Sequence, residues 1–258
     1  MVSLIKKKNS KLIARQVISL EIEALKLLKR SLNRNFDKAV NAIVNCQSKI
    51  IFCGVGKSGL IASKIASTMS SVGCPAFSLS ANDCLHGDLG SISTKDLLIL
   101  ISNSGKSKEL LPIIKFANRN KIKIIGIVSE KNSSLYKGSD IQILLPEVKE
   151  AGLGIVPTSS TSVQLAVGDA LAVSALNKKK FSKYDFSKLH PGGNLGKQLK
   201  TVEELMVTKN KIPFINENKN LKNAIKTITS KKLGVLIAKN SKGLTKGILT
   251  DGNVRKLR

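Results

Sequence analysis

The sequence predicts an α/β protein in which helices cover a parallel sheet. From residue 49 onward, short apolar runs alternate with longer segments whose apolar residues recur at helical spacing, as in β-α-β units. Of the 258 residues, 42% are hydrophobic but only 3% are aromatic, so Ile, Leu, Val and Ala build the core. Such aliphatic strands are typical of parallel sheets that are buried on both faces.

An amphipathic helical segment is expected first, at residues 10–45, where Leu and Ile are interspersed with Lys and Arg. Strands are then expected at residues 50–53, 76–79, 97–101, 122–128 and 141–145, with helices between the first four and a last long helix at 161–176. Ligands of such sheets bind beyond the carboxyl ends of the strands. The loops predicted to carry the site are therefore residues 54–59, 80–88, 102–107 and 146–160.

A shift in composition near residue 200 predicts a second, small α+β unit. Its pattern is β-α-β-β-α with a helix at residues 221–229. About 60 residues hold only a small core, so this unit is expected to need a partner surface. The predicted domains are residues 1–200 and 201–258.

The charge of the chain predicts anionic small molecules as ligands. The net charge is +26, but only six of the 43 basic residues are Arg, and the basic residues are spread along the chain. Phosphate and base recognition by nucleic-acid-binding proteins favours Arg and stacking aromatics, so we expect no specific nucleic-acid partner. Neither an apolar signal-peptide core nor an apolar run of about 18 residues occurs, so a cytoplasmic protein without membrane contact is expected.

The four cysteines, Cys46, Cys53, Cys74 and Cys84, show no C-x-x-C pairing. They are interpreted as small buried residues of a reducing compartment, and neither a metal nor another cofactor is predicted.

A serine-rich loop carries the strongest signal for a binding site. The apolar run at residues 97–101 is followed by Ser102, Ser104 and Ser107 and then by a helical pattern. Hydroxyls and free N–H groups at a helix start form an anion site. Glu109 is expected one turn inside this helix, which places a carboxylate beside the predicted phosphate.

A glycine-rich turn precedes Lys57 and Ser58 in the loop at residues 54–59. It satisfies G-x-G-x-x-G, but the next strand ends without the acidic residue of a dinucleotide site, and Ile51 replaces the first Gly of a Walker A loop. A turn that brings backbone and Lys57 to a ligand remains, with a purely structural turn as the alternative.

Two histidines and one further carboxylate complete the candidates. His86 and His190 both lie in glycine-rich loops and are suited to proton transfer, although a structural role is the alternative. Glu150 precedes Thr158, Ser159 and Ser160 at the start of the last long helix, a second anion-friendly helix terminus. A solvated loop carboxylate is an equally good interpretation of Glu150.

Five motifs in this order, GVGKSG, HGDLG, ISNSGKSKE, PTSST and KLHPGGNLGK, resemble the arabinose-5-phosphate isomerases, which are sugar-isomerase (SIS) domains followed by CBS repeats. The resemblance covers most of residues 10–258. It implies interconversion of D-ribulose 5-phosphate and D-arabinose 5-phosphate, for the eight-carbon acid (Kdo) of lipopolysaccharide. It also implies the site residues: catalytic Lys57, Glu109, Glu150 and His190, and substrate-binding Ser58, Gly73, Cys74, His86, Ser102, Ser104, Ser107, Thr158, Ser159 and Ser160.

The chain departs from this family at three places. Lys106 and Lys108 flank the serine loop where members commonly carry Glu and Ser, and Ser80 replaces a histidine that joins an inhibitory zinc site in better-known members. Zinc sensitivity is therefore left open. Members carry two CBS repeats, whereas this sequence ends in the last helix of the first.

The resemblance also implies a mechanism and partners. Residues 102–107 and 158–160 would anchor the 5-phosphate, Glu109 or Glu150 would move the proton, Lys57 would stabilise the enediolate, and His190 would assist. A homodimer or homotetramer and a nucleotide-type ligand of the CBS repeat are expected. The alternatives are a sugar-phosphate-binding regulator of the same fold and an isomerase of another phosphosugar.

Overall fold

The computed structural model describes residues 9–190 and 201–256. The chain divides into two compact units, residues 1–197 and 198–258, and each is described separately.

The first unit is built on a sheet of five parallel strands in the order β2-β1-β3-β4-β5. The strands are β1 (Ile50–Gly54), β2 (Ala76–Ser80), β3 (Leu97–Ile101), β4 (Lys123–Val128) and β5 (Ile141–Leu144). All five were predicted to within one residue at each end, and the predicted fold class is confirmed.

Helices surround this sheet: α1 (Ser10–Ser31), α2 (Arg34–Val44), α3 (Lys57–Ser71), α4 (Ala81–Cys84), α5 (Leu110–Arg119), α6 (Ser134–Gly138), α7 (Gly152–Ile155), α8 (Ser159–Lys178) and α9 (Lys183–Leu189), with a 3-10 turn η1 (Asp88–Ser91). The single helical segment expected at residues 10–45 is wrong in one respect, because it is two helices. The Asn33 side chain accepts from the N–H of Asn35 at 2.9 Å and caps α2, so the chain breaks there.

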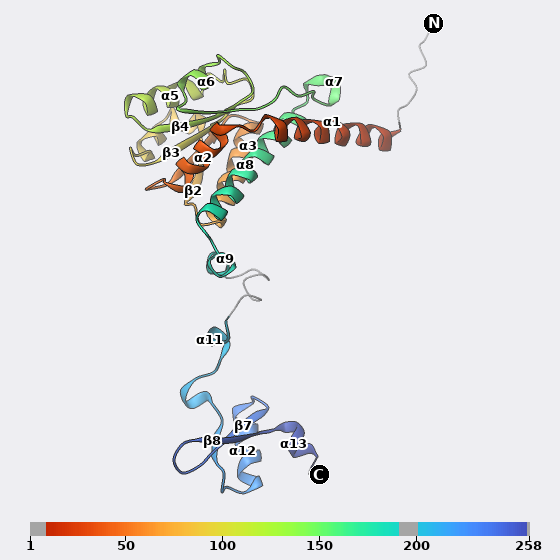
Figure 1. Cartoon of the computed structure of the whole chain (residues 1–258), viewed down its shortest axis with the longest axis vertical. Helices are drawn as coiled ribbons and strands as arrows, with labels where there is room; N and C mark the ends of the chain where they lie inside the picture. Colours follow the sequence, from red (N-terminus) through yellow and green to blue (C-terminus); the bar gives the residue numbers. More distant parts are fainter. Residues whose placement is uncertain (1–8, 191–200, 257–258) are drawn as a thin grey trace. The chain divides into compact units, whose positions relative to one another are not determined.

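The helices form two layers, one on each face of the sheet (Figure 1). Residues of α1, α2, α3 and α8 share a core with alternate strand residues such as Phe52 and Ile99. Residues of α4, α5 and α6 share a second core with the intervening strand residues, such as Cys53 and Leu100. The alternation along each strand follows from its two-residue side-chain period.

The strand order changes direction between β1 and β3. From β1 the chain crosses through α3 to β2 on one side, whereas from β3 it crosses through α5 to β4 on the other. Because α3 and α5 pack on opposite faces, their amino termini diverge and leave a crevice at the carboxyl ends of β1 and β3. Gly54 pairs with Ile101 in the ladder, so the loops that follow these strands start at the same level.

Helices α3 and α8 run parallel to each other. Lys64 of α3 pairs with Asp169 of α8 at 2.5 Å, and a Cβ on Gly168 would lie 2.2 Å from Cδ1 of Ile65. Further along, the ammonium of Lys179 donates to the carbonyl of Gly73. Both helices therefore begin at the carboxyl edge of the sheet.

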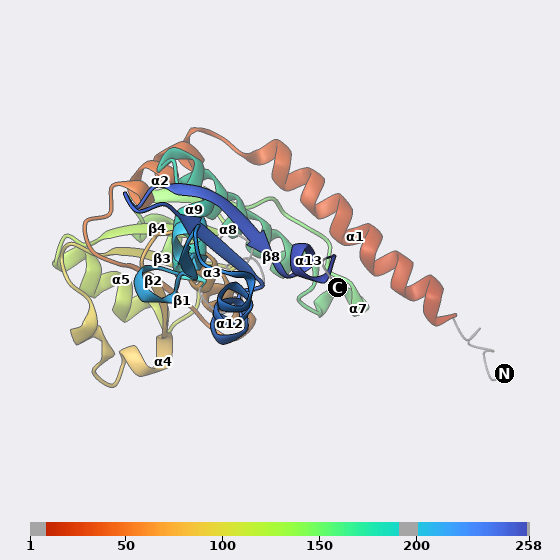
Figure 2. The same cartoon turned by 90° about the horizontal axis from the view of Figure 1, so that it is seen from below.

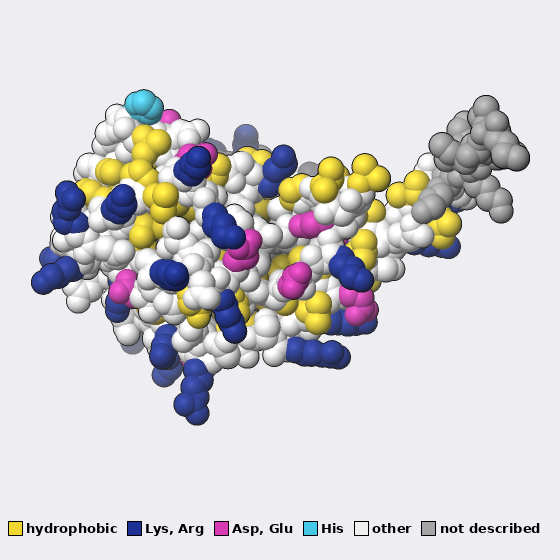
Figure 3. All heavy atoms as spheres, turned by 90° about the horizontal axis from the view of Figure 1, so that it is seen from above, with side chains coloured by type: hydrophobic (Ala, Val, Ile, Leu, Met, Phe, Trp, Pro, Cys, Tyr) yellow, Lys and Arg dark blue, Asp and Glu magenta, His cyan; other side chains and the backbone are white. Residues whose placement is uncertain are grey.

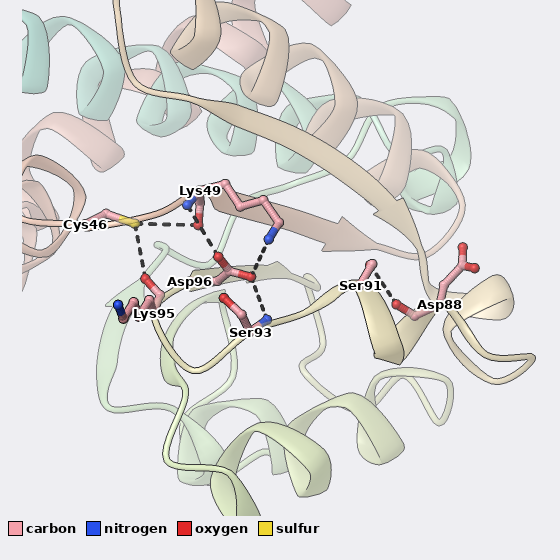
Figure 4. A network of polar contacts seen from close by, with 7 residues as sticks. All are labelled: Cys46, Lys49, Asp88, Ser91, Ser93, Lys95 and Asp96. Atoms are coloured by element: carbon pink, nitrogen blue, oxygen red, sulfur yellow. Dashed lines mark hydrogen bonds and ion pairs between the residues drawn. The ribbon is translucent and has the colours of Figure 1, made fainter.

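A buried carboxylate organises the opposite, amino edge (Figure 4). Asp96 accepts from the backbone N–H of Ser93 at 2.7 Å and from the ammonium of Lys49 at 2.9 Å. Next to it, the Cys46 thiol lies 3.5 Å from the carbonyl oxygen of Lys49. A cavity of about 610 Å³ opens at this edge, away from the motif loops.

Helix α1 projects beyond the sheet and carries exposed apolar side chains (Figures 1 and 2). Its inner residues Ala24 and Leu28 are buried, but Ile18 is 56% exposed and Ile22 47%. Figure 3 shows apolar side chains along this arm. In the described residues, no helix combines the length and apolar character that crossing a bilayer requires.

The second unit contains a three-stranded sheet in the order β6-β7-β8, with β6 and β7 parallel and β7 and β8 antiparallel. Its elements are α11 (Val202–Leu205), a 3-10 turn η2 (Lys209–Lys211), β6 (Phe214–Asn216), α12 (Leu221–Lys231), β7 (Val235–Lys239), β8 (Thr245–Thr250) and α13 (Asp251–Arg255). Its buried core consists of Ala224, Ile228 and Leu236. The assignment as a CBS repeat stays a prediction.

Candidate active site

The turn between β1 and α3 places Lys57 at the crevice. A Cβ on Gly54 would lie 2.8 Å from backbone atoms of Ser58, and one on Gly59 would lie 2.8 Å from the carbonyl oxygen of Gly54. Strand and helix can therefore approach this closely only with glycine at both positions. Lys57 is the first residue of α3 and is exposed, and Ser58 beside it is half-buried.

The serine loop after β3 folds around a buried hydroxyl. Ser102 is 4% exposed; its Oγ accepts from the N–H of Gly105 at 3.1 Å and lies 3.0 Å from the Oγ of Ser107. The Oγ of Ser104 accepts from the N–H of Lys106 at 3.3 Å. Gly105 has φ +64°, which allows the chain to turn back toward α5. The loop thus gathers three hydroxyls at the carboxyl end of β3.

The position expected for Glu109 is wrong by about one turn. Glu109 is not inside α5 but immediately precedes it, at the N-cap position. The reason is that the N–H of Leu110 bonds the carbonyl oxygen of Ser107 at 3.2 Å, so a tight turn takes up residues 107–110 before α5 begins. Glu109 is half-buried and lies within this turn, closer to the serine loop than predicted.

The first of the two added lysines is neutralised by a residue that sequence reasoning missed. The ammonium of Lys106 lies 2.5 Å from Oε2 of Glu130. Glu130 follows β4 by two residues and therefore belongs to the same sheet edge, which was the available signal. Lys108 is exposed.

Glu150 binds the amino terminus of α8. Its Oε2 accepts from the N–H of Thr158 at 2.8 Å and from the Thr158 hydroxyl at 3.1 Å, and its Oε1 accepts from the N–H of Ser160 at 3.3 Å. Burial raises the pKa of Glu150, but the hydrogen bonds from Ser160 and Thr158 outweigh it and hold the pKa below its usual range. The predicted use of residues 158–160 as a second phosphate anchor must therefore compete with this carboxylate.

The parallel packing of α3 and α8 brings Lys57 and Glu150 to one region. Counting back eight residues from the contact between Ile65 and Gly168 reaches Lys57 on α3 and Ser160 on α8. Because both helices rise by the same amount per residue, these two positions lie at the same level along the two helices, toward the carboxyl edge. Ser160 binds Glu150, so the carboxylate is held at the level where α3 begins.

Three predicted residues are not brought to this edge within the unit. Gly73 and Cys74 precede β2 and lie at the amino edge, where Gly73 packs against the ring of Phe181 and burial raises the pKa of the Cys74 thiol. His190 follows α9, which comes after the far end of α8. Its ring stacks on Phe186 with 3.9 Å between centroids, and Nδ1 lies 2.9 Å from the carbonyl oxygen of Phe186.

His86 lies in the loop after α4 and is exposed. It follows β2, an edge strand, and so belongs to the carboxyl edge of the sheet. The remainder of the HPGGNLG motif, residues 191–196, falls outside the described residues. Ser159 is fully buried at the start of α8, and its hydroxyl has no hydrogen-bond partner among the residues that the structure describes.

Within residues 9–190 and 201–256, no three side chains of His, Cys, Asp or Glu gather as a metal site would require. Cys84, which the sequence places beside His86, is buried, and burial raises the pKa of its thiol.

Comparisons with known proteins identify relatives over nearly the whole chain. The SIS domain model matches residues 43–174. An arabinose 5-phosphate isomerase (KdsD) of Yersinia pestis is 40% identical over 245 residues, which are 94% of this chain and 75% of that protein. The KdsD of Escherichia coli K12 is 37% identical with the same coverage. A structure from Escherichia coli CFT073, solved in complex with arabinose 5-phosphate, has 36% identity and a TM-score of 0.68, and covers 71% of this chain and 100% of that one.

Proposed function

The chain belongs to the SIS-domain family of arabinose 5-phosphate isomerases, and we propose that it interconverts D-ribulose 5-phosphate and D-arabinose 5-phosphate. One observation supports this activity above the others. The serine loop and Lys57 flank the same crevice between β1 and β3, so hydroxyls and a cation suited to a phosphosugar lie where ligands of such sheets bind.

The proposed reaction moves one proton between two neighbouring carbons. A carboxylate removes a proton from C1 of the ketose, and the carbonyl oxygen at C2 gains negative charge as the 1,2-enediolate forms. The hydroxyl proton on O1 passes to O2, and the protonated carboxylate returns its proton to C2, which leaves the carbonyl at C1 of the aldose. Glu109 is the candidate base because it lies in the turn that follows the serine loop. Lys57 stabilises the developing oxyanion from the first turn of α3.

The 5-phosphate binds residues 102–107 in this proposal. Ser104 and Ser107 are half-buried and contribute hydroxyls, and Lys108 adds positive charge. Anchoring the unreactive end of the substrate holds C1 and C2 against the catalytic groups, which is how remote binding energy accelerates a reaction.

A homo-oligomer is part of the proposal. The exposed apolar residues of α1 form a face suited to a second copy of the chain. The position of His190 away from the carboxyl edge supports the same idea, because in an oligomer a neighbouring copy can supply this residue. Cys74 is buried and Gly73 packs against Phe181 within their own subunit. The family resemblance alone supports two further parts of the proposal. They are a nucleotide-type ligand of the second unit and the supply of product to lipopolysaccharide synthesis.

A coupled assay tests the activity. Purified protein is offered D-ribulose 5-phosphate, with D-fructose 6-phosphate as the control substrate, and product is measured by chromatography. We expect turnover of the pentose phosphate and solvent deuterium at C2 of the aldose. Glu109→Gln and Lys57→Met are expected to lose at least about a hundredfold in kcat. Turnover of the hexose phosphate alone would point to another phosphosugar, and binding without turnover would favour the regulator.

A further inference from the structure

We propose that Thr158 is a positioning residue for Glu150 and that the amino terminus of α8 binds this carboxylate and not the phosphate of the substrate. The inference rests on the proposed function. It assigns phosphate binding to residues 102–107 alone.

The Thr158 hydroxyl has one orientation. Its Oγ1 accepts from the N–H of Ala151 at 3.0 Å, so its own proton is free to donate to Oε2 of Glu150 at 3.1 Å. The Thr158 hydroxyl thus binds both the backbone of Ala151 and the side chain of Glu150. The isolated bridge between Ala151 and Val156 closes the loop between them.

Two backbone donors at this helix start already bind an anion. Thr158 and Ser160 direct their backbone N–H groups at the Glu150 carboxylate, at 2.8 and 3.3 Å. A phosphate at the same place would have to displace the carboxylate or lie against it, and two anions at such a distance repel each other. The hydroxyls of Ser102, Ser104 and Ser107 contact only other hydroxyls and N–H groups among the described residues, and the Glu130 carboxylate contacts this loop through the ammonium of Lys106.

The bound carboxylate places a fixed negative charge at the active-site edge. The amino terminus of α8 holds Glu150 at the level where Lys57 begins α3. Glu147 and Lys149, the charged neighbours on its own segment, line one cavity with Glu23 of α1. A change at Thr158 leaves all of them in place.

The decisive experiment separates kcat from KM. Thr158→Val removes the hydroxyl and keeps the shape and the backbone N–H, and Thr161→Val is the matched control, because the Thr161 hydroxyl bonds the carbonyl oxygen of Thr158 at 2.9 Å instead of Glu150. For Thr158→Val we expect kcat to fall about tenfold, the equivalent of one charge-assisted hydrogen bond, with KM within about twofold of the wild type. Thr158→Ser should recover most of the loss, and Thr161→Val should behave as the wild type.

Two further measurements distinguish positioning from phosphate binding. The acid limb of the kcat profile should move to higher pH in Thr158→Val, since a bond that favours ionised Glu150 is lost. Inorganic phosphate, used as a competitive inhibitor, should keep its Ki in Thr158→Val and bind about tenfold more weakly to Ser107→Ala. Weaker phosphate inhibition of Thr158→Val with unchanged kcat would overturn the inference, and so would an unchanged kcat and pH profile.

Failure of the proposed activity is distinguishable from failure of this inference. If the wild type turns over no pentose phosphate, the activity is wrong, and phosphate binding is then measured by calorimetry. Loss of binding in Ser107→Ala with retention in Thr158→Val still supports the inference, and the reverse pattern contradicts it. Circular dichroism and thermal melts of each variant identify any that has failed to fold.

Discussion

Two carboxylates, one buried and one half-buried, show how single residues keep a charge in this protein. Burial opposes the ionisation of Asp96, but the N–H of Ser93 and the ammonium of Lys49 outweigh it and lower the pKa to about 2. The groups that lower the pKa of Glu150 are neutral hydroxyls and N–H groups. Asp96 therefore belongs to a balanced ion pair that stabilises the fold, whereas the negative charge of Glu150 stays available to the site.

Asp96→Asn tests whether the ion pair of Asp96 stabilises the fold. Because the pKa of Asp96 is depressed from 3.8 to about 2, its stabilisation is fully present above about pH 4 and is lost as the pH falls through about 2. We expect the variant to lose about 2 kcal/mol of unfolding free energy at pH 7 and almost none at pH 2. Urea titrations at both pH values measure this.

Glu23→Gln is the matched control. Glu23 also pairs with a lysine, Lys26 at 2.7 Å, but the two side chains are 66% and 58% exposed. Surface pairs contribute little, so its unfolding free energy should stay within about 0.5 kcal/mol of the wild type at either pH. An equal loss in both variants would contradict the role assigned to Asp96.

At the scale of one element, the loop between β3 and α5 depends on a single glycine. Gly105 combines φ +64° with a close approach, since a Cβ would lie 2.2 Å from Oγ of Ser133 and 2.5 Å from Cγ2 of Val128. The carbonyl oxygen of Gly105 also accepts from the N–H of Leu135 at 3.0 Å. The serine loop is thus held in shape by the segment that follows β4.

Gly105→Ala should displace this loop. We expect KM for the phosphosugar to rise at least about tenfold and the protein to lose about 2 kcal/mol of stability, from backbone strain and the clash with Ser133. Gly247→Ala is the control, because a Cβ on Gly247 meets nothing within 4 Å. Steady-state kinetics and thermal melts of the two variants measure the effect, and an unchanged KM in Gly105→Ala would argue against this loop as the phosphate site.

Local patterns predicted the elements better than the contacts between them. The strands were found because apolar runs mark buried parallel strands, and the loops at their ends because such sheets present one edge to ligands. The break between α1 and α2 was missed, since the apolar pattern continues past the cap at Asn33. The bond between Glu150 and Thr158 could not be predicted, because it depends on how the loop between them closes.

At the scale of the whole molecule, two features favour association with a partner. The apolar residues of α1 are exposed, and in the second unit the buried core formed by residues 201–256 consists of three side chains. Small cores are stabilised by association, so both features agree with the proposed homo-oligomer.

Ile18→Glu tests the surface on α1. Ile18 is 56% exposed, so a charge there should not disturb the core, but it should weaken a contact between copies. We expect a lower mass in light scattering at micromolar concentration and a parallel fall in specific activity. Val173→Glu, at a 54% exposed position of α8, controls for added charge. The same mass for both variants and the wild type would exclude α1 as the contact.

Removal of residues 201–258 tests the second unit. The shortened protein retains the sheet, the serine loop, Lys57 and Glu150, so we expect isomerase turnover to persist and oligomerisation or regulation to weaken. Light scattering and the coupled assay measure the two properties. Loss of turnover in a folded, shortened protein would show that the first unit is not sufficient.

The packing of α8 against α3 at Gly168 and Ile65 controls the orientation of α8 from a point distant from the catalytic groups. Gly168 lies eight residues from Ser160, about 12 Å along the helix axis, and a Cβ there would meet Cδ1 of Ile65 at 2.2 Å. Gly168→Ala should tilt α8 and move the groups that bind Glu150 away from Lys57. We therefore expect kcat to fall, although no catalytic group has changed. Ile65→Ala should restore kcat in the double variant, and a double-mutant cycle measures this coupling. The residues at positions 65 and 168 are therefore expected to covary among relatives, so that a larger side chain at one position occurs with a smaller side chain at the other.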